Sequence, residues 1–184
     1  TISAMGYSAI DSSYRYVLTE NGKFYYSLDD GENWTITSSF TGPGSHYFYG
    51  STIWASRYNL NTVYIGGSGY SNAAVYVSHD HGQTFTEMDN GLPNTLVFQL
   101  AGTPNDVILF AATEVGPYGY AYNKDEWFLL SGISAPDQTY WTVDYITEIN
   151  TARFGTYGRG IWDFALNDNY NINYGEVNQD NVVN

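Results

Sequence analysis

The sequence contains no cysteine and few basic residues, and both shortages narrow what the protein can do. Without cysteine there is neither a disulfide framework nor thiol chemistry. Lysine and arginine number 6 against 19 aspartate and glutamate residues, for a formal net charge of −13. With no basic patch to displace phosphate counterions, nucleic acid and anionic membrane surfaces are disfavoured as partners. No apolar run approaches the roughly 18 residues of a spanning helix, so membrane insertion is not expected.

The residues that are abundant favour strands over helices. Of the 184 residues, 43% are hydrophobic and 18% are aromatic, including 19 Tyr and 5 Trp. This apolar content can form the core of one globular domain, and strand- and turn-forming residues outnumber helix-forming ones. The lysine-poor composition is typical of a secreted bacterial protein. No signal peptide is visible at Thr1, and we expect the chain to be processed or excised from a longer protein.

One short segment occurs twice and predicts a tight hairpin turn. In each copy an Asp can accept hydrogen bonds from turn N–H groups, a Gly can take positive φ, and an aromatic residue can anchor the returning strand. A structural role therefore explains both carboxylates, although they are also candidates for catalysis. The positions that define the pattern are Ser27, Asp29, Gly31 and Trp34 in the first copy and Ser78, Asp80, Gly82 and Phe85 in the second.

Short apolar runs separated by turn residues form four successive units. In the first unit, strands are expected at 14–19, 23–28 and 34–38, and a segment around Ser8–Ile10 is the candidate for a fourth. The second strands of the units begin near residues 14, 62, 107 and 151, and this period of about 45 matches a propeller blade. The prediction is an all-β propeller of three complete four-stranded blades and most of a fourth, with a β-sandwich as the alternative.

The repeated segment resembles the Asp-box, or bacterial neuraminidase repeat, of sialidases, xyloglucanase-type glycoside hydrolases and sortilin-like propellers. The segment from Phe154 to Trp162 is similar to the closing strand pair of secreted bacterial propellers. The resemblance implies a propeller architecture but no single activity, since the family contains both hydrolases and non-enzymes. Because such propellers usually have six to eight blades, we expect the C-terminal part of a larger propeller; a closed four-bladed ring is the alternative.

The composition changes after residue 166. Residues 167–174 read as a polar linker, and residues 175–184 resemble the opening of a dockerin calcium loop. This resemblance implies calcium as a cofactor, with Glu176, Asn178 and Asp180 as ligands, and a cohesin-like partner. Glu in place of the usual Asp at the first position and Asn181 in place of Gly depart from the pattern, and the bidentate acidic ligand is missing.

Other polar residues are weaker candidates for chemistry. Asp144 and Glu114 could lie in a cleft, and a glycosidase needs two carboxyls about 5–10 Å apart, but solvated or structural carboxylates are the favoured interpretation. A sialidase binds its substrate carboxylate with three clustered arginines. The chain has four arginines, two of them in the region of the closing strands, so a complete triad is not expected; they are Arg15, Arg57, Arg153 and Arg159. The three histidines, His46, His79 and His81, lack a spacing that predicts zinc.

Aromatic residues give the strongest functional signal. Exposed rings can stack on sugar faces or anchor a protein, and core packing between blades uses the same residues. We expect packing for Trp34, Phe85, Trp127 and Trp162, whereas both roles remain open for the loop containing Tyr47, Phe48 and Tyr49. The candidate ligand-binding aromatics are Tyr47, Phe48, Tyr49, Trp54 and Tyr118.

Together these features predict a secreted propeller segment that binds a polysaccharide or a protein surface, or acts as a scaffold. The first alternative is the C-terminal part of a secreted glycoside hydrolase acting on polysaccharide. The second is a structural subunit of an extracellular assembly, in which a neighbouring chain supplies a missing strand.

Overall fold

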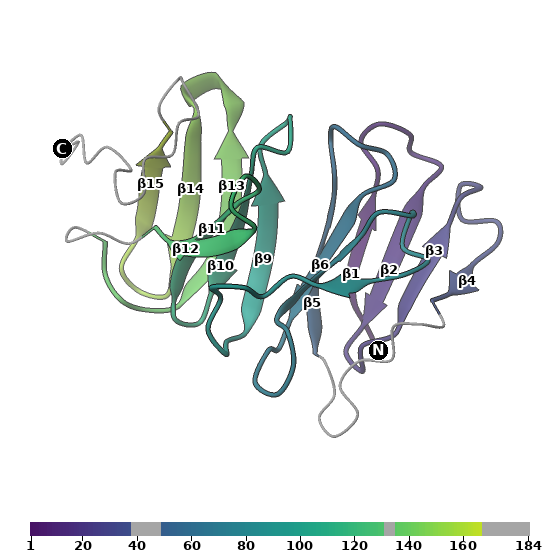
Figure 1. Ribbon diagram of the computed structural model, residues 1–184, viewed down its shortest axis with the longest axis horizontal. Helices are drawn as coiled ribbons and strands as arrows, with labels where there is room; N and C mark the ends of the chain where they lie inside the picture. Colours follow the sequence, from purple (N-terminus) through teal and green to yellow (C-terminus); the bar gives the residue numbers. More distant parts are fainter. Residues whose placement is uncertain (38–48, 131–134, 167–184) are drawn as a thin grey trace.

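The computed structural model describes residues 1–37, 49–130 and 135–166. Within these residues, four antiparallel sheets follow one another along the chain, and each pairs its strands in sequence order (Figure 1). We call them blades 1 to 4. Their strands are β1 (Ile2–Tyr7), β2 (Arg15–Thr19), β3 (Phe24–Ser27) and β4 (Thr35–Ile36); β5 (Gly50–Ala55), β6 (Val63–Gly67), β7 (Val75–Ser78) and β8 (Thr86–Glu87); β9 (Val97–Gly102), β10 (Ile108–Thr113), β11 (Gly116–Ala121) and β12 (Glu126–Leu129); and β13 (Tyr140–Ile146), β14 (Thr151–Thr156) and β15 (Ile161–Ala165).

The position predicted for the first strand of blade 1 was wrong. That strand is Ile2–Tyr7, and Ser8–Ile10 lies in the loop that follows it. The Ser8 hydroxyl accepts hydrogen bonds from the backbone N–H groups of Ile10 (3.1 Å) and Asp11 (3.3 Å). A serine that bonds to the backbone just ahead of it favours a turn over a strand. The other predicted strands are present, with second strands beginning at residues 15, 63, 108 and 151.

The blades stack side by side through their first strands. Strand β1 contacts β5, β5 contacts β9, and β9 contacts β13, while blades 1 and 4 lie at opposite ends of the molecule in Figure 1. This arrangement is a partial β-propeller; it is neither the two packed sheets of a β-sandwich nor, over the described residues, a closed ring. In the described part of the chain, one 3₁₀ turn, Thr147–Ile149, accompanies the strands.

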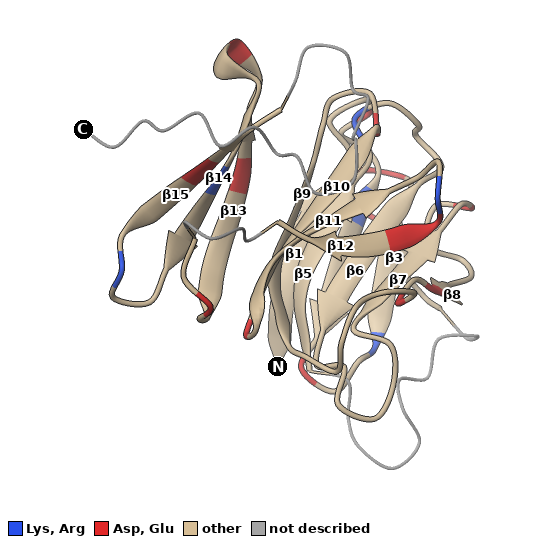
Figure 2. Cartoon of the chain, turned by 60° about the vertical axis from the view of Figure 1, so that its left-hand side comes forward, with Lys and Arg blue, Asp and Glu red and all other residues tan. Residues whose placement is uncertain are grey.

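The surface is acidic and holds few ion pairs. Acidic segments are distributed over the loops and strands of all four blades, with few basic ones among them (Figure 2). Arg15 pairs with Asp30 and Arg153 with Asp163, and all four side chains are exposed; such pairs contribute about 1 kcal/mol or less each. Among the described residues there is no helix long and apolar enough to cross a membrane.

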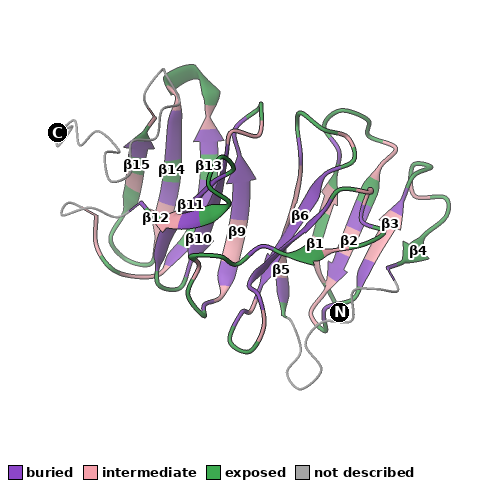
Figure 3. Cartoon of the chain, viewed as in Figure 1, coloured by how far each residue is buried: buried purple, intermediate pink, exposed green. Residues whose placement is uncertain are grey.

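Three apolar clusters lie between successive blades. Buried residues are found on strands of all four blades (Figure 3), and each cluster joins residues of two successive blades. Because strand side chains alternate between the two faces of a sheet, blades 2 and 3 contribute one set of side chains to each neighbour. The cluster between blades 1 and 2 includes Leu18, Phe24, Ile65 and Tyr76. The cluster between blades 2 and 3 includes Tyr64, Val77, Leu109 and Trp127, and the one between blades 3 and 4 includes Phe110, Ala112, Val143 and Phe154.

All blades share the same two ends. Since strand direction alternates, the connection into each new blade and the turn between its second and third strands lie at the end where the first strands begin. We call this the entry end; it is the lower edge of blades 1 and 2 in Figure 1. The turns between third and fourth strands, including both copies of the repeated segment, lie at the opposite end.

Burial of tyrosines predicts instability at high pH. Burial raises the pKa of Tyr16, Tyr64 and Tyr140 to about 12 each, whereas an unfolded tyrosine has a pKa of about 10. Between about pH 10 and 12 the folded protein therefore retains protons that the unfolded chain loses, so the free energy of unfolding falls as pH rises. We expect part of the tyrosinate absorbance to appear together with the loss of near-ultraviolet circular dichroism. Complete tyrosine titration near pH 10 with the fold intact would contradict this.

Candidate functional site

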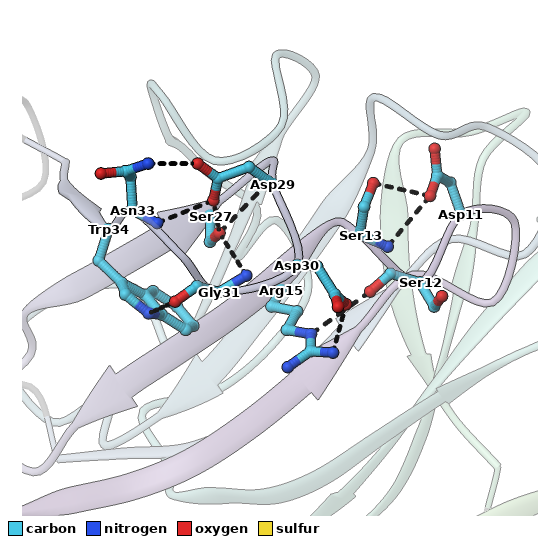
Figure 4. Close-up of polar contacts among 10 residues, drawn as sticks. All are labelled: Asp11, Ser12, Ser13, Arg15, Ser27, Asp29, Asp30, Gly31, Asn33 and Trp34. Atoms are coloured by element: carbon cyan, nitrogen blue, oxygen red, sulfur yellow. Dashed lines mark hydrogen bonds and ion pairs between the residues drawn. The ribbon is translucent and has the colours of Figure 1, made fainter.

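The first copy of the repeated segment forms a hydrogen-bonded turn between β3 and β4 (Figure 4). The Ser27 hydroxyl donates to Asp29 Oδ1 (2.7 Å) and accepts from the Gly31 N–H (2.9 Å). Asp29 also accepts from Asn33 through its backbone N–H (2.9 Å) and its side-chain amide (2.7 Å). The Trp34 Nε1–H donates to the Gly31 carbonyl at 3.0 Å. The turn thus engages both oxygens of the Asp29 carboxylate.

The second copy repeats this geometry between β7 and β8. The Ser78 hydroxyl donates to Asp80 Oδ1 (2.7 Å) and accepts from the Gly82 N–H (2.8 Å). Thr84 donates to the two Asp80 oxygens through its backbone N–H (2.8 Å) and its hydroxyl (2.6 Å). Gly31 and Gly82 share a φ of 89°, the left-handed region that glycine occupies without a Cβ clash.

These hydrogen bonds stabilise the charged carboxylates. Bonds from Asn33 and Ser27 lower the pKa of Asp29 to about 2. Burial acts to raise the pKa of Asp80, but the bonds from Thr84 and Ser78 outweigh it and the pKa is lowered. A carboxyl that stays ionised at neutral pH and is fully engaged by its own turn is poorly suited to donate a proton in catalysis. The geometry gives both residues a structural role.

At the entry end, backbone segments from blades 2, 3 and 4 are joined into a continuous band. Ser68 of the β6–β7 connection forms a β-bridge with Leu96, which precedes β9. The band links the blade entries to the turns beside them, so its positions are fixed relative to one another. Its hydrogen bonds run from the N–H of Ser68 to the Tyr49 carbonyl (3.1 Å), from the N–H of Glu114 to the Leu96 carbonyl (3.0 Å), from the Thr139 hydroxyl to the Glu114 carbonyl (3.1 Å) and from the N–H of Tyr157 to the Thr139 carbonyl (3.3 Å).

Exposed aromatic rings gather along this band. Trp141, on the first strand of blade 4, is 46% exposed, and Tyr157, in the β14–β15 turn, is 78% exposed. Their ring centroids are 6.3 Å apart, and Trp141 also packs against Phe98 of β9 at 4.2 Å. Contacts on two sides hold the Trp141 ring in place while part of it faces solvent. We call Tyr49, Tyr70, Glu114, Trp141 and Tyr157 the rim.

A tyrosine–carboxylate pair lies on the same band. The Tyr70 hydroxyl donates to Glu114 Oε2 at 2.5 Å, and this bond is the main cause that raises the pKa of Tyr70. Both side chains are on exposed turns, Tyr70 between β6 and β7 and Glu114 between β10 and β11. The rim therefore combines aromatic surface with a carboxylate that can accept a hydrogen bond from a ligand hydroxyl.

The sequence-predicted aromatics divide between the rim and the core. Tyr49 lies on the rim and is exposed, whereas Tyr47 and Phe48 lie outside the described residues. Tyr118 was wrongly predicted as a candidate for stacking: it is buried in the cluster between blades 2 and 3. Trp54 is half-buried between blades, with the Arg57 guanidinium carbon 4.9 Å from its ring centroid. Neither ring is free to receive a ligand.

The predicted charged candidates are dispersed. Asp144 lies opposite Arg153 on the outer face of blade 4, away from the Glu114 turn. Arg15 and Arg153 lie in different blades, each paired with its own aspartate. Thr62 contacts His79 Nδ1, and the His81 ring lies against Tyr14. Across residues 1–37, 49–130 and 135–166, acidic and histidine side chains form no group of three that could hold a metal.

The remaining candidates fall outside the described part of the chain. His46 and the three expected calcium ligands, Glu176, Asn178 and Asp180, are among these residues. Conversely, sequence reasoning did not select Trp141, Tyr157 or Tyr70 as ligand-binding residues. The sequence offers only a weak signal for two of them: Trp141 is a large aromatic at the start of a blade's first strand, and Tyr157 is another in the turn beside it.

Comparison with solved structures supports the β-propeller fold. No family model and no curated relative match the sequence. Among solved structures, an ancestral GH74 enzyme matches 92% of the chain with a TM-score of 0.74 and 15% identity. The GH74 xyloglucanase from Xanthomonas campestris matches 84% (TM-score 0.67, 13% identity), and the extracellular domain of a protein described as a B. thetaiotaomicron hybrid two-component system matches 89% (0.67, 17%). The chain spans only 26%, 26% and 21% of these proteins.

Proposed function

We propose that the chain is an extracellular, Asp-box-type propeller segment whose rim binds a neutral polysaccharide. The observation that carries the proposal is the pair of exposed rings, Trp141 and Tyr157, held side by side on the band that also carries Glu114. The two repeated turns support the Asp-box assignment through their matching hydrogen bonds. Structural similarity to a xyloglucanase and to an extracellular domain supports the ligand class and the location.

The chemistry of the rim suits a sugar chain. The C–H faces of a pyranose ring are apolar, and covering them with an aromatic ring removes both surfaces from water. Hydroxyl groups at the sugar edge can donate to Glu114, and the Tyr70 hydroxyl can exchange partners with them. The net charge of −13 would repel an acidic polymer, which favours an uncharged polysaccharide.

Substitution of the two rim rings tests the proposal. We expect Trp141→Ala and Tyr157→Ala each to weaken binding to xyloglucan or another neutral β-glucan by about fivefold, because each removes one stacking platform worth about 1 kcal/mol. Isothermal titration calorimetry measures the affinity. Tyr58→Ala is the matched control, since Tyr58 is 72% exposed in the β5–β6 connection at the other end of the blades.

The outcomes separate the proposal from its alternatives. Equal weakening by Tyr58→Ala, or stronger binding of polygalacturonate than of neutral glucans, would contradict a rim site for neutral sugars. Release of oligosaccharides by the wild-type protein, lost in Glu114→Gln, would instead favour the hydrolase, with the Glu114 carboxyl as one of its two acidic groups.

A further inference from the structure

The two exposed rings of the rim are tilted relative to each other. The planes of Trp141 and Tyr157 form an angle of 55°, and their centroids are 6.3 Å apart. The apolar contact between a sugar face and an aromatic ring is largest when the two are parallel, so each ring orients the sugar unit that lies on it. Two successive sugar units that cover both rings must therefore be turned relative to each other by a similar angle.

The orientation of the Trp141 ring is set by the neighbouring blade. The ring packs against Phe98 of β9, with centroids 4.2 Å apart and an angle of 39° between the planes. Phe98 is itself half-buried, and β13, the strand that carries Trp141, contacts β9. A rotation large enough to make Trp141 parallel to Tyr157 would disturb this packing.

The turn that carries Tyr157 is held by hydrogen bonds on both sides. The Tyr157 N–H donates to the Thr139 carbonyl (3.3 Å), and the N–H and hydroxyl of Thr156 donate to the Gly160 carbonyl (3.0 and 2.8 Å). The Arg159 N–H donates to the Thr156 hydroxyl oxygen at 3.2 Å. The backbone below both rings is thus fixed, and the tilt between the rings is a property of the rim before any ligand binds.

The linkage of a glucan decides whether successive units match this tilt. A β-1,4-linked chain favours a flat ribbon, in which the faces of successive sugar rings are nearly parallel. A β-1,3 link instead turns each unit out of the plane of the one before it, and the chain coils. A flat ribbon lying on one rim ring presents its next unit at the wrong angle to the other ring, whereas a coiled chain can cover both.

We infer that the rim selects a coiled, β-1,3-linked glucan over a flat, β-1,4-linked one. This rests on the proposed function, in which Trp141 and Tyr157 receive sugar units. A chain that already has the required bend loses less conformational freedom on binding than one that must be twisted out of its flat form, and this preorganisation increases affinity. Hydroxyl groups lie along the edges of both chains, so the Glu114 carboxylate does not discriminate between them.

Two glucose hexasaccharides that differ only in their linkage test the inference. Laminarihexaose is β-1,3-linked, cellohexaose is β-1,4-linked, and both are neutral. Calorimetric titration of the 184-residue chain should give an affinity about fivefold higher for laminarihexaose. Equal affinities, or tighter binding of cellohexaose, would refute the inference and leave the proposed function standing. If the chain binds neither these hexasaccharides nor xyloglucan, the proposed function fails and the inference fails with it.

Removal of one ring should abolish the preference as well as weaken binding. With a single ring left there is no angle for the chain to match, so Trp141→Ala and Tyr157→Ala should each bring the two affinities to within about twofold. Tyr157→Phe keeps the ring and should keep the preference. Tyr58→Ala, which removes an exposed ring at the other end of the blades, should keep it as well.

The variants also separate ring tilt from other causes of selectivity. A preference that survives both Trp141→Ala and Tyr157→Ala would overturn the inference, because the discrimination would then arise away from the two rings. Loss of the preference in Tyr157→Phe would overturn it as well, since the Tyr157 hydroxyl rather than the angle between the rings would be responsible.

Discussion

Gly82→Ala is expected to destabilise the protein by about 3 kcal/mol. A left-handed φ costs an L-residue about 1–2 kcal/mol, and Gly82 has a φ of 89°. In addition, a Cβ at this position would lie 2.5 Å from Cε1 of Phe24. Phe24 is a fully buried, rigid ring of blade 1, and overpacking of this kind adds about 1–3 kcal/mol. Urea unfolding followed by circular dichroism gives the change in midpoint.

Gly31→Ala is the matched control for this effect. Gly31 has the same φ and the same place in the first turn, but a Cβ there would lie 3.4 Å from the nearest atom, a nitrogen of the exposed Arg15 side chain. We therefore expect only the backbone cost of about 1–2 kcal/mol. Equal losses for the two substitutions would show that backbone conformation alone explains Gly82, and that contact with Phe24 adds nothing.

Trp127→Ala is expected to cause the second large loss, about 4 kcal/mol. Trp127 is almost fully buried between blades 2 and 3, and its Nε1–H donates to the Met88 carbonyl at 2.7 Å. Removing a buried tryptophan typically costs about 3–5 kcal/mol, and the Met88 carbonyl loses its donor as well. Because domains are stable by about 5–15 kcal/mol, we expect a large shift of the urea midpoint.

Trp34→Ala is the control for Trp127→Ala. Trp34 also donates its Nε1–H to a backbone carbonyl, that of Gly31, but its ring is half exposed. In the 184-residue chain its removal should cost about 1 kcal/mol or less. A comparable loss for both substitutions would contradict the assignment of stability to the interblade cluster.

The sequence was sufficient for those parts of the structure that are specified locally. The repeated turns depend on residues a few positions apart, since Ser27, Asp29 and Gly31 bond within one loop. The strand period depends on alternating residues and on turn residues, both visible in order along the chain. The sequence therefore predicted three four-stranded blades and most of a fourth, as observed. The first strand of blade 1 was misplaced, because the polar turn at Ser8–Ile10 was taken for the strand itself.

Exposure of aromatic residues required the structure, because it depends on contacts between blades. Tyr118 and Tyr157 are each followed by a glycine, yet one is buried between blades 2 and 3 and the other is 78% exposed. No local pattern distinguishes a strand face that meets a neighbouring blade from one that ends in solvent. The rim likewise joins turns from three blades through backbone hydrogen bonds and the Thr139 hydroxyl, and these contacts have no sequence signature.

The division of the core into three interblade clusters has a consequence for how the protein opens. In such an array stability is a sum over neighbouring contacts. Over the described residues, the strands of blade 4 pack mainly on blade 3, whereas blades 2 and 3 are held on both sides. Amide hydrogens of β13–β15 should then exchange with solvent through a partial opening that leaves β6 and β10 protected. Blade 4 carries Trp141 and Tyr157. A sugar chain bound to these rings would therefore stabilise blade 4 against this partial opening and slow the exchange of its amide hydrogens.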